Sequence, residues 1–331
     1  MTMKDLGIDT ARPHPAREAA LWLLIGCILA LGIGFSWNAT PFAQFMAAVF
    51  IACALVHAGV FYTWRTASAL FLICIVITFI IENIGTTIGF PFGRYHFEVG
   101  AGLPYVGRIP IIVGPLWFGG GYFSWVVAST LLDGADRLLD RKFNFFALPV
   151  VAAFVMTQWD LVMDPPSATI ARAWIWHDGG ADFGVPLSNY FGWLFTSWLF
   201  FQAFAVYLRR RQADPPQSER IERKLRLIAI LFYVSAGLTH VLPWLIGQSG
   251  EVVDAAGHVW QVHDLRETAV AVKYSPCSFR LCWRRCAWRA NARRSDTAAS
   301  GRAARVCYGV ISTCAQECYF STAPAPRNNE Q

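Results

Sequence analysis

Apolar side chains fill several stretches of about 20 residues in the first three quarters of the chain, and short polar segments separate them. A helix that crosses a bilayer needs about 20 mostly apolar residues. On this criterion seven segments are predicted to span a membrane: 19–37, 41–64, 67–84, 109–132, 144–163, 187–207 and 225–247. The pattern therefore predicts an all-α fold, a polytopic integral membrane bundle of about seven transmembrane helices.

The first apolar segment follows Arg12 and Arg17, as the apolar part of a secretory signal peptide follows its basic part. It lacks a convincing small-residue cleavage site, however, and another apolar segment follows at once. We therefore predict that 19–37 is retained as a helix and that 1–18 forms a cytoplasmic N-terminal segment.

The composition agrees with a membrane protein. Of the 331 residues, 55% are hydrophobic and only 15% are charged, whereas an average soluble domain has about 25% charged residues. The mean hydropathy is +0.38. These values argue against a soluble globular enzyme and against a disordered chain.

The net charge of +6 does not describe the main body of the chain. Residues 273–331 hold ten Lys and Arg against three Asp and Glu, so the rest of the chain is close to neutral. Six of the nine cysteines also lie in this tail. The sequence thus divides into a transmembrane domain, 19–272, and a basic, Cys- and Arg-rich tail, 273–331, and the main body shows no sign of nucleic-acid binding.

Basic residues in the loops predict the orientation, because cytoplasmic loops are enriched in Lys and Arg. With the N-terminus in the cytoplasm, 14 basic residues lie on the cytoplasmic side, and Arg94, Arg108 and Arg172 lie on the other. We predict a multi-pass protein of the inner (cytoplasmic) membrane with a cytoplasmic N-terminus.

Ionisable side chains at membrane depth are costly and are therefore functional candidates. Glu82 closes the third predicted span, Asp160 and Asp164 close the fifth, and His240 lies in the seventh. The two aspartates are four residues apart and so share one helical face. In the predicted orientation all of these groups, and the loop residues His177 and Asp178, lie towards the non-cytoplasmic face, which suggests one polar cavity at that surface.

Each candidate also has a simpler interpretation. Glu82 and Asp160 could reach the lipid headgroups, and Asp164 could only end its helix before Pro165-Pro166. For His240 a packing role and a functional role are equally good explanations, whereas a packing role explains His57 better. An aromatic belt accounts for most of the tryptophans near the membrane surfaces, namely Trp117, Trp159, Trp174, Trp176, Trp193, Trp198 and Trp244.

Motifs of soluble enzymes are missing from the sequence. Gly119-Gly120-Gly121 lies inside a predicted span and indicates close helix packing. His and carboxylate residues are too scattered for a zinc motif, and the pair Cys282 and Cys286 has no matching second pair. No metal site is predicted.

Two stretches carry a specific resemblance. The first is ENIGTTIGFPFGRY at 82–95, continuing through LPYVGRIP at 103–110 to Trp117. The second is WDLVMDP at 159–165, then WIW at 174–176 and GVPLSNYFGW at 184–193. Together they resemble the membrane-integral carotenoid biosynthesis family that includes carotenoid 1,2-hydratases and bisanhydrobacterioruberin hydratase, over roughly residues 20–270.

The resemblance implies a hydratase, a lyase that acts on a long apolar polyene in the bilayer without a redox cofactor. An acid protonates C2 of a terminal C1=C2 double bond, and water attacks the tertiary cation at C1. A desolvated carboxylic acid can keep its proton near neutrality, a second carboxylate can position water, and aromatic faces can stabilise the cation. Glu82, Asp160 and Asp164 are the candidate catalytic residues. The candidate substrate-binding residues are Tyr95, Trp117, Trp159, Trp176, Asn189, Trp193 and His240.

The implied partners are a lycopene-like carotenoid, the lipid bilayer and other enzymes of carotenoid biosynthesis. Three alternatives stay open at this point: another acid-initiated reaction of the end group such as cyclisation, a transporter for a small organic solute, and a non-catalytic carotenoid-binding protein. The transporter is less favoured because the chain shows no obvious internal repeat.

The tail departs from the family pattern, since a further apolar helix is expected near Lys273. Two explanations remain open: a reading-frame shift near codon 273 that removed or altered this eighth helix, or a genuine, disordered basic tail.

The orientation can be tested with reporter fusions at Gly100 and Gly179. We expect activity only from a reporter that works after export, because both positions lie in predicted non-cytoplasmic loops, 85–108 and 164–186. Activity of a cytoplasmic reporter at both positions would contradict the orientation.

Overall fold

The computed structural model describes residues 22, 40–99, 102–211, 219–235 and 238–274. The predicted N-terminal segment 1–18, the span at 19–37 apart from Trp22, and the tail from Ser275 onward lie outside the described residues. The chain divides after Tyr274 into two units, and the fold described below belongs to the first.

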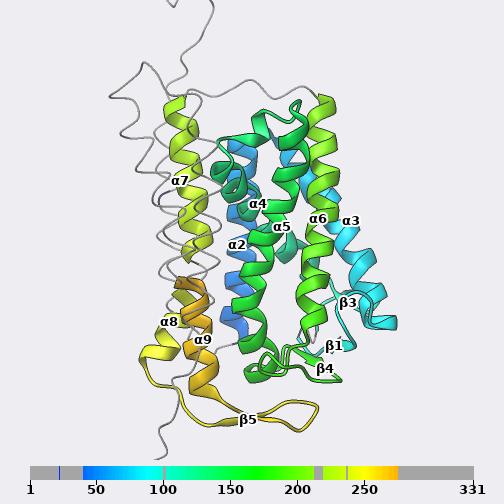
Figure 1. The fold of residues 1–331 in the computed structure, drawn as a ribbon, viewed down its shortest axis with the longest axis vertical. Coiled ribbons are helices and arrows are strands. Elements are labelled where there is room, and N and C mark those ends of the chain that lie inside the picture. The colour runs from blue at the N-terminus through cyan, green and yellow to red at the C-terminus, as the bar shows by residue number, and fades with distance from the viewer. Residues whose placement is uncertain (1–21, 23–39, 100–101, 212–218, 236–237, 275–331) are drawn as a thin grey trace, which may run out of the picture. The chain divides into compact units, whose positions relative to one another are not determined.

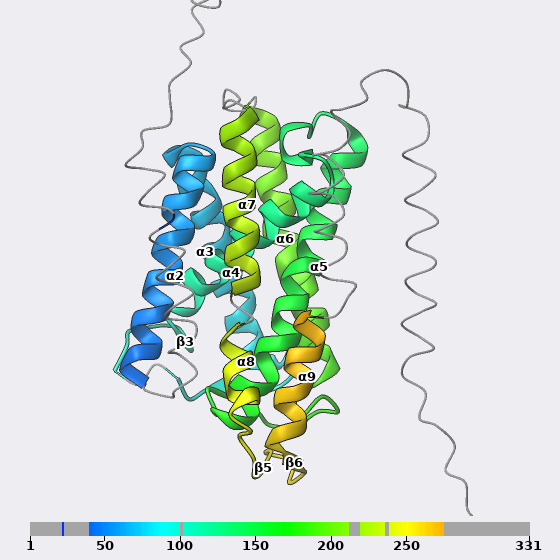
Figure 2. The same ribbon diagram turned by 90° about the vertical axis from the view of Figure 1, so that its left-hand side faces the viewer.

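Helices make up most of the described residues (Figures 1 and 2). The α-helices are α2 (Thr40–Phe61), α3 (Trp64–Ile88), α4 (Val113–Leu131), α5 (Lys142–Pro165), α6 (Leu187–Arg211), α7 (Glu219–Ser235), α8 (Leu238–Leu245) and α9 (Val262–Tyr274). A short 3-10 helix, η2 (Ala135–Arg137), precedes α5, and a π-helix, η3 (Pro166–Ile170), follows it directly.

Three of the described helices are long and apolar enough to cross a membrane: α3, α5 continued through η3, and α6. Within α2 the apolar stretch is shorter, at Ala47–Phe61. The span predicted at 109–132 corresponds to α4. The helical membrane protein is thus supported, while the number of seven spans stays a prediction.

The span predicted at 225–247 coincides with α7 and α8, and residues 236–237 between these helices lie outside the described residues. Helix α7 begins at Glu219, within a charged segment that was expected to be loop. One of its charged residues, Arg226, is stabilised in the bundle by an ion pair with the buried Asp136.

Three small antiparallel sheets, which the all-α prediction did not include, lie in the connecting segments. The strand pairs are β1 (Tyr95–Phe97) with β4 (Trp174–Trp176), β2 (Tyr105–Val106) with β3 (Ile109–Pro110), and β5 (Glu251–Val253) with β6 (Val259–Gln261). The β1–β4 pair joins the segment after α3 to the segment after α5, with Tyr95 opposite Trp176.

Helix α4 is the buried centre of the bundle and packs against α2, α3, α5 and α7. Every residue from Trp117 to Ser129 is buried. The three consecutive glycines make this possible, because a Cβ would lie 2.6 Å from Phe50 at Gly119, 3.1 Å from Met156 at Gly120 and 3.1 Å from Phe200 at Gly121. Small residues therefore let three neighbouring helices approach one helix closely, as the sequence indicated.

Both ends of α3 carry capping features. The side chain of Thr63 accepts a hydrogen bond from the backbone N–H of Thr66 at 3.3 Å, which satisfies a free donor at the helix start. Gly89 ends the helix in the left-handed conformation, with φ of 84°. This turn leads the chain into β1 and so fixes the end of α3 that carries Glu82.

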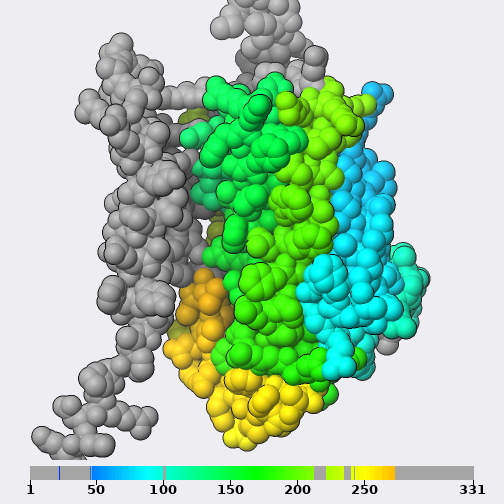
Figure 3. Space-filling view, turned by 45° about the vertical axis from the view of Figure 1, so that its right-hand side comes forward, coloured from blue at the N-terminus to red at the C-terminus, as the bar shows by residue number. Residues whose placement is uncertain are grey.

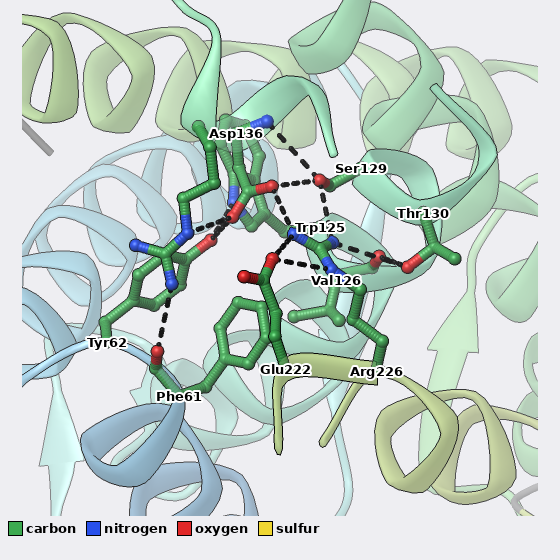
Figure 4. Close-up of polar contacts among 10 residues, drawn as sticks. Phe61, Tyr62, Trp125, Val126, Ser129, Thr130, Asp136, Glu222 and Arg226 are labelled. Carbon is green, nitrogen blue, oxygen red and sulfur yellow. Dashed lines mark hydrogen bonds and ion pairs between the residues drawn. The ribbon is translucent and has the colours of Figure 1, made fainter. Parts of the chain in front are cut away.

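A buried polar network, the Asp136 cluster, holds α7 against the bundle at the end opposite to β1 and β4 (Figures 1 and 4). Its members are Tyr62, Trp125, Ser129, Asp136, Glu222 and Arg226. The Arg226 guanidinium donates to Asp136 at 2.8 Å, to Glu222 at 2.6 Å and to the Ser129 hydroxyl at 3.0 Å. The Tyr62 hydroxyl donates to the other oxygen of Asp136 at 2.7 Å.

Asp136 is ionised in this network. Burial opposes the charged form, but the charges of Arg226 and Arg137 outweigh burial and hold the pKa of Asp136 below its usual value. His57, on α2, donates from Nε2 to the carbonyl oxygen of Leu225 at 3.0 Å and accepts at Nδ1 from the Tyr122 hydroxyl at 2.6 Å. His57 therefore has the packing position that the sequence favoured.

Replacing one member of the pair should destabilise the fold strongly. We expect Arg226→Met to lower the free energy of unfolding by about 3–5 kcal/mol, because it leaves a buried carboxylate without its cation. Thermal unfolding of the detergent-solubilised protein measures this. Arg223→Met, at an exposed position of the same helix, is the control and should change little, and equal effects of the two variants would contradict a structural role for the Asp136 cluster.

Candidate functional site

Four helix ends meet at one end of the bundle. Helices α3 and α5 end there, α4 and α6 begin there, and the β1–β4 pair lies beside them (Figure 1). The space-filling view shows α3, α5 and α6 packed side by side above this end (Figure 3). The three carboxyl groups singled out from the sequence all lie on these elements.

The carboxyl group of Glu82 is buried near the end of α3 and is held by two aromatic donors. The hydroxyl of Tyr95, from β1, donates to Oε2. The indole N–H of Trp117, from the first turn and a half of α4, donates to Oε1 at 2.9 Å. Glu82 therefore faces the interior of the bundle rather than the lipid headgroups.

Asp160 and Asp164 are joined by one amide, that of Asn189. Its Nδ2 atom donates to Asp160 Oδ2 at 2.9 Å and to Asp164 Oδ2 at 2.6 Å. The indole N–H of Trp174 donates to Asp164 Oδ1 at 2.5 Å. Asp160 is 0% exposed and Asp164 is 1% exposed, so neither aspartate is an interfacial surface residue.

One oxygen of this pair stands apart. Asp160 Oδ1 is buried and has no hydrogen-bond partner among the described residues. A buried polar atom without a partner costs free energy, and such atoms are rare enough to need an explanation. An oxygen that carries a proton for transfer to a bound substrate would be one.

Asp164 does not end its helix, although Pro165 and Pro166 follow it. Helix α5 runs through Pro165, and the backbone then continues as η3 to Ile170. A π-turn of this kind often occurs at functional sites. Asp164 and Asp160 both lie within α5, and their four-residue spacing places them on the same helical face.

Aromatic rings wall the site. Trp117 stacks on Trp193 of α6 with ring centroids 3.9 Å apart, and Tyr95 packs on Trp176 at 4.8 Å. Phe92, buried, packs on both Tyr95 and Trp117. Glycines make room for it, since a Cβ would lie 2.8 Å from the Phe92 ring at Gly85 and 2.4 Å at Gly192.

The structure thus brings together most of the residues named from the sequence, but not all of them. Glu82, with Tyr95 and Trp117, interacts electrostatically with the pair that Asn189 joins. Trp159 points elsewhere, stacking with Phe50 of α2 at 6.1 Å. His240 lies buried on α8, a helix that packs against α7 and α9, and its role stays a prediction.

Sequence reasoning missed two contributors. Trp174 was assigned to an aromatic belt, yet its N–H binds Asp164. Phe92 lies within the motif at 82–95 and fills the space between Gly85 and Gly192, a role that the motif alone does not indicate. The glycines in the two motifs were the available signal for Phe92. A glycine is favoured where the backbone approaches a bulky ring closely.

The loop residues His177 and Asp178 do not join the buried site. Asp178 forms an exposed ion pair with Arg94, whose hydrogen bond lowers the pKa of Asp178. His177 contacts His96, with Nε2 and Nδ1 2.7 Å apart. Within the described residues no group of His, Cys, Asp and Glu could hold a metal ion.

Two small cavities occur in the described part of the chain, and neither is lined by Glu82, Asp160 or Asp164. One of about 20 Å³ is lined by Thr169, Arg172, Trp176 and Asp254, among others, and has room for about one water molecule. The other, of about 10 Å³, has an apolar lining formed by Phe50, Gly120, Phe123, Trp159, Phe232 and Tyr233.

Comparison with known proteins gives one match. The model of a family described as carotenoid biosynthesis protein matches residues 41–255. No curated protein and no solved structure gives a significant match. The matched range includes all the carboxyl groups and aromatic walls described above.

Removing the bridge between the aspartates should destabilise the site. We expect Asn189→Leu to lower the free energy of unfolding by about 1–3 kcal/mol, because two buried carboxyl groups lose a donor and gain none. Thermal unfolding in detergent measures the change. Asn144→Leu, which removes a hydrogen bond to the Leu138 carbonyl, is the matched control and should cost less. A larger loss in the control would show that the bridge matters little to the fold.

Proposed function

The chain belongs to the carotenoid biosynthesis protein family, and on this premise we propose that it adds water across a terminal C1=C2 double bond of an acyclic polyene. The product is a tertiary alcohol. The single observation that carries the proposal is the buried, unpartnered Oδ1 of Asp160 beside a second carboxyl group. Such a pair supplies both a proton and a base in a place without bulk water.

Asp160 is the proton donor in this proposal. Two carboxylates buried so close together repel each other, so the pair is more stable with one proton between them. Asp164 accepts hydrogen bonds at both oxygens, from Trp174 and Asn189, which favours its charged form. The proton then resides on Asp160, whose Oδ1 is free to deliver it to C2 of the double bond.

The aromatic walls and Glu82 stabilise the cation that forms at C1. Faces of Trp and Tyr rings attract cations, and Trp117, Trp193, Tyr95 and Trp176 provide such rings. Glu82 adds a carboxyl group nearby, oriented by the N–H of Trp117 and the hydroxyl of Tyr95. In this role Glu82 acts through charge and does not itself give up a proton.

Water completes the reaction. Asp164 positions a water molecule and takes its proton as the oxygen bonds to C1. The proton then passes to Asp160, which restores the pair, so the sum of the steps is polyene plus water giving alcohol. The cavity beside Trp176 and Thr169 is a suitable place for water to enter from the membrane surface.

The polyene itself needs an apolar path. The apolar cavity lined by Gly120, Phe123 and Trp159, with residues from α2 and α7, lies along the face of α4 one turn beyond Trp117. We place the chain of the substrate along this face, with its end group at Asp160. In the predicted orientation the reacting end is the non-cytoplasmic one, and other enzymes of carotenoid biosynthesis are expected partners in the inner membrane.

Carboxamide variants separate the roles. We expect Asp160→Asn to reduce product formation by about 10²–10⁴-fold, because an amide keeps the size of the side chain but cannot protonate carbon. Glu82→Gln should reduce it less. Both are expressed in a lycopene-producing bacterium, and the pigments are quantified by mass spectrometry relative to the amount of protein in the membrane.

Glu98→Gln, at an exposed position beside the same end of the bundle, is the control and should keep wild-type activity. Near wild-type product from Asp160→Asn would exclude Asp160 as the acid. If all three carboxamides at Glu82, Asp160 and Asp164 left the product unchanged, the non-catalytic carotenoid-binding protein would be the better explanation.

A further inference from the structure

Helix α9 contains an arginine where its pattern calls for an apolar residue. The buried positions of α9 are Val262, Leu265, Arg266 and Ala269, at the i, i+3, i+4, i+7 spacing of one helical face. This face packs against α5, α8 and η3, and Figures 2 and 3 show α9 beside α5 near the β5–β6 end of the bundle. Arg266 is therefore directed into a helix interface.

Arg266 is buried without a counter-charge. It is 9% exposed, and its Nε atom is enclosed and has no hydrogen-bond partner among the described residues. Burial lowers the pKa of Arg266, and none of the ion pairs among the described residues includes this guanidinium. The acidic residues of α9 itself, Asp264 and Glu267, are exposed.

Arg226 is the informative comparison. It is buried to the same degree, with 8% exposed, yet it binds Asp136, Glu222 and Ser129. An arginine remains charged in proteins, and a buried charge without a partner destabilises a fold strongly. Carboxylates and a hydroxyl of the bundle neutralise and bind Arg226. The described residues provide no carboxylate and no hydrogen-bond acceptor for Arg266.

We propose that Arg266 binds the phosphate group of an anion, supplied by a phospholipid headgroup. The planar guanidinium fits phosphate oxygens through two parallel hydrogen bonds. Arg266 lies in the second turn of α9, which begins directly after the β5–β6 hairpin, so it sits close to the end of the bundle where headgroups are expected. The site is separate from the carboxyl groups and does not depend on the proposed reaction.

The test uses the purified full chain in vesicles of phosphatidylcholine, with and without phosphatidylglycerol. Thermal unfolding is followed by the fluorescence of the 14 tryptophans. We expect phosphatidylglycerol to raise the unfolding temperature of the wild type by roughly 3–6 °C. Arg266→Met should lose this rise, and in pure phosphatidylcholine it should be at least as stable as the wild type, because it removes an unpaired buried charge.

Arg172→Met, at an exposed position towards the same end, is the matched control and should keep the full rise. Inorganic phosphate added to pure phosphatidylcholine vesicles separates the two sources of phosphate: an equal rise would assign the site to a free anion instead of a lipid. The proposal is overturned if Arg266→Met keeps the response to phosphatidylglycerol, or if the wild type has no response to either form of phosphate.

Discussion

The amide of Asn189 holds two buried carboxyl groups together, and the functional end of the bundle is arranged around this bridge. Asp160 and Asp164 come from α5, while Asn189 comes from α6, so the bridge fixes the relative position of these two helices. Polar groups removed from water must find partners within the protein. The Trp174 N–H meets this need for Asp164, and the one oxygen left without a described partner is Asp160 Oδ1. The chemistry proposed here starts from that exception.

The two ends of the bundle solve the problem of a buried carboxyl group differently. Asp136 is neutralised by Arg226 and Arg137 and serves to hold α7 in place. Asp160 and Asp164 have the Asn189 amide and the Trp174 indole as donors, and no described basic residue is bonded to them. A carboxylate paired with arginine has no proton to give, whereas carboxyl groups held by neutral donors can exchange protons. This difference in partners, more than burial, separates the structural end from the candidate catalytic end.

The apolar pattern was sufficient to predict a helical membrane protein, and the placement of charges singled out Glu82, Asp160 and Asp164, which the structure brings to one end of the bundle. The apolar pattern did not predict that α7 begins at Glu219, because the first residues of this helix are mostly charged. The Asp136 cluster was also missed, since Asp136 and Arg226 are 90 residues apart and each looks like an ordinary loop charge. Trp174 was assigned to an aromatic belt because nothing in its local sequence shows that an antiparallel strand pair carries it back to Asp164.

Isotope labelling of the product tests the central claim most directly. Membranes that contain the protein are supplied with lycopene in water enriched in ¹⁸O, and in a parallel experiment in D₂O. The account predicts a product heavier by one water, with its oxygen labelled by ¹⁸O and one deuterium on the carbon next to the alcohol. A product that gains deuterium but no oxygen would contradict hydration and indicate cyclisation, and unchanged lycopene would contradict a catalytic role.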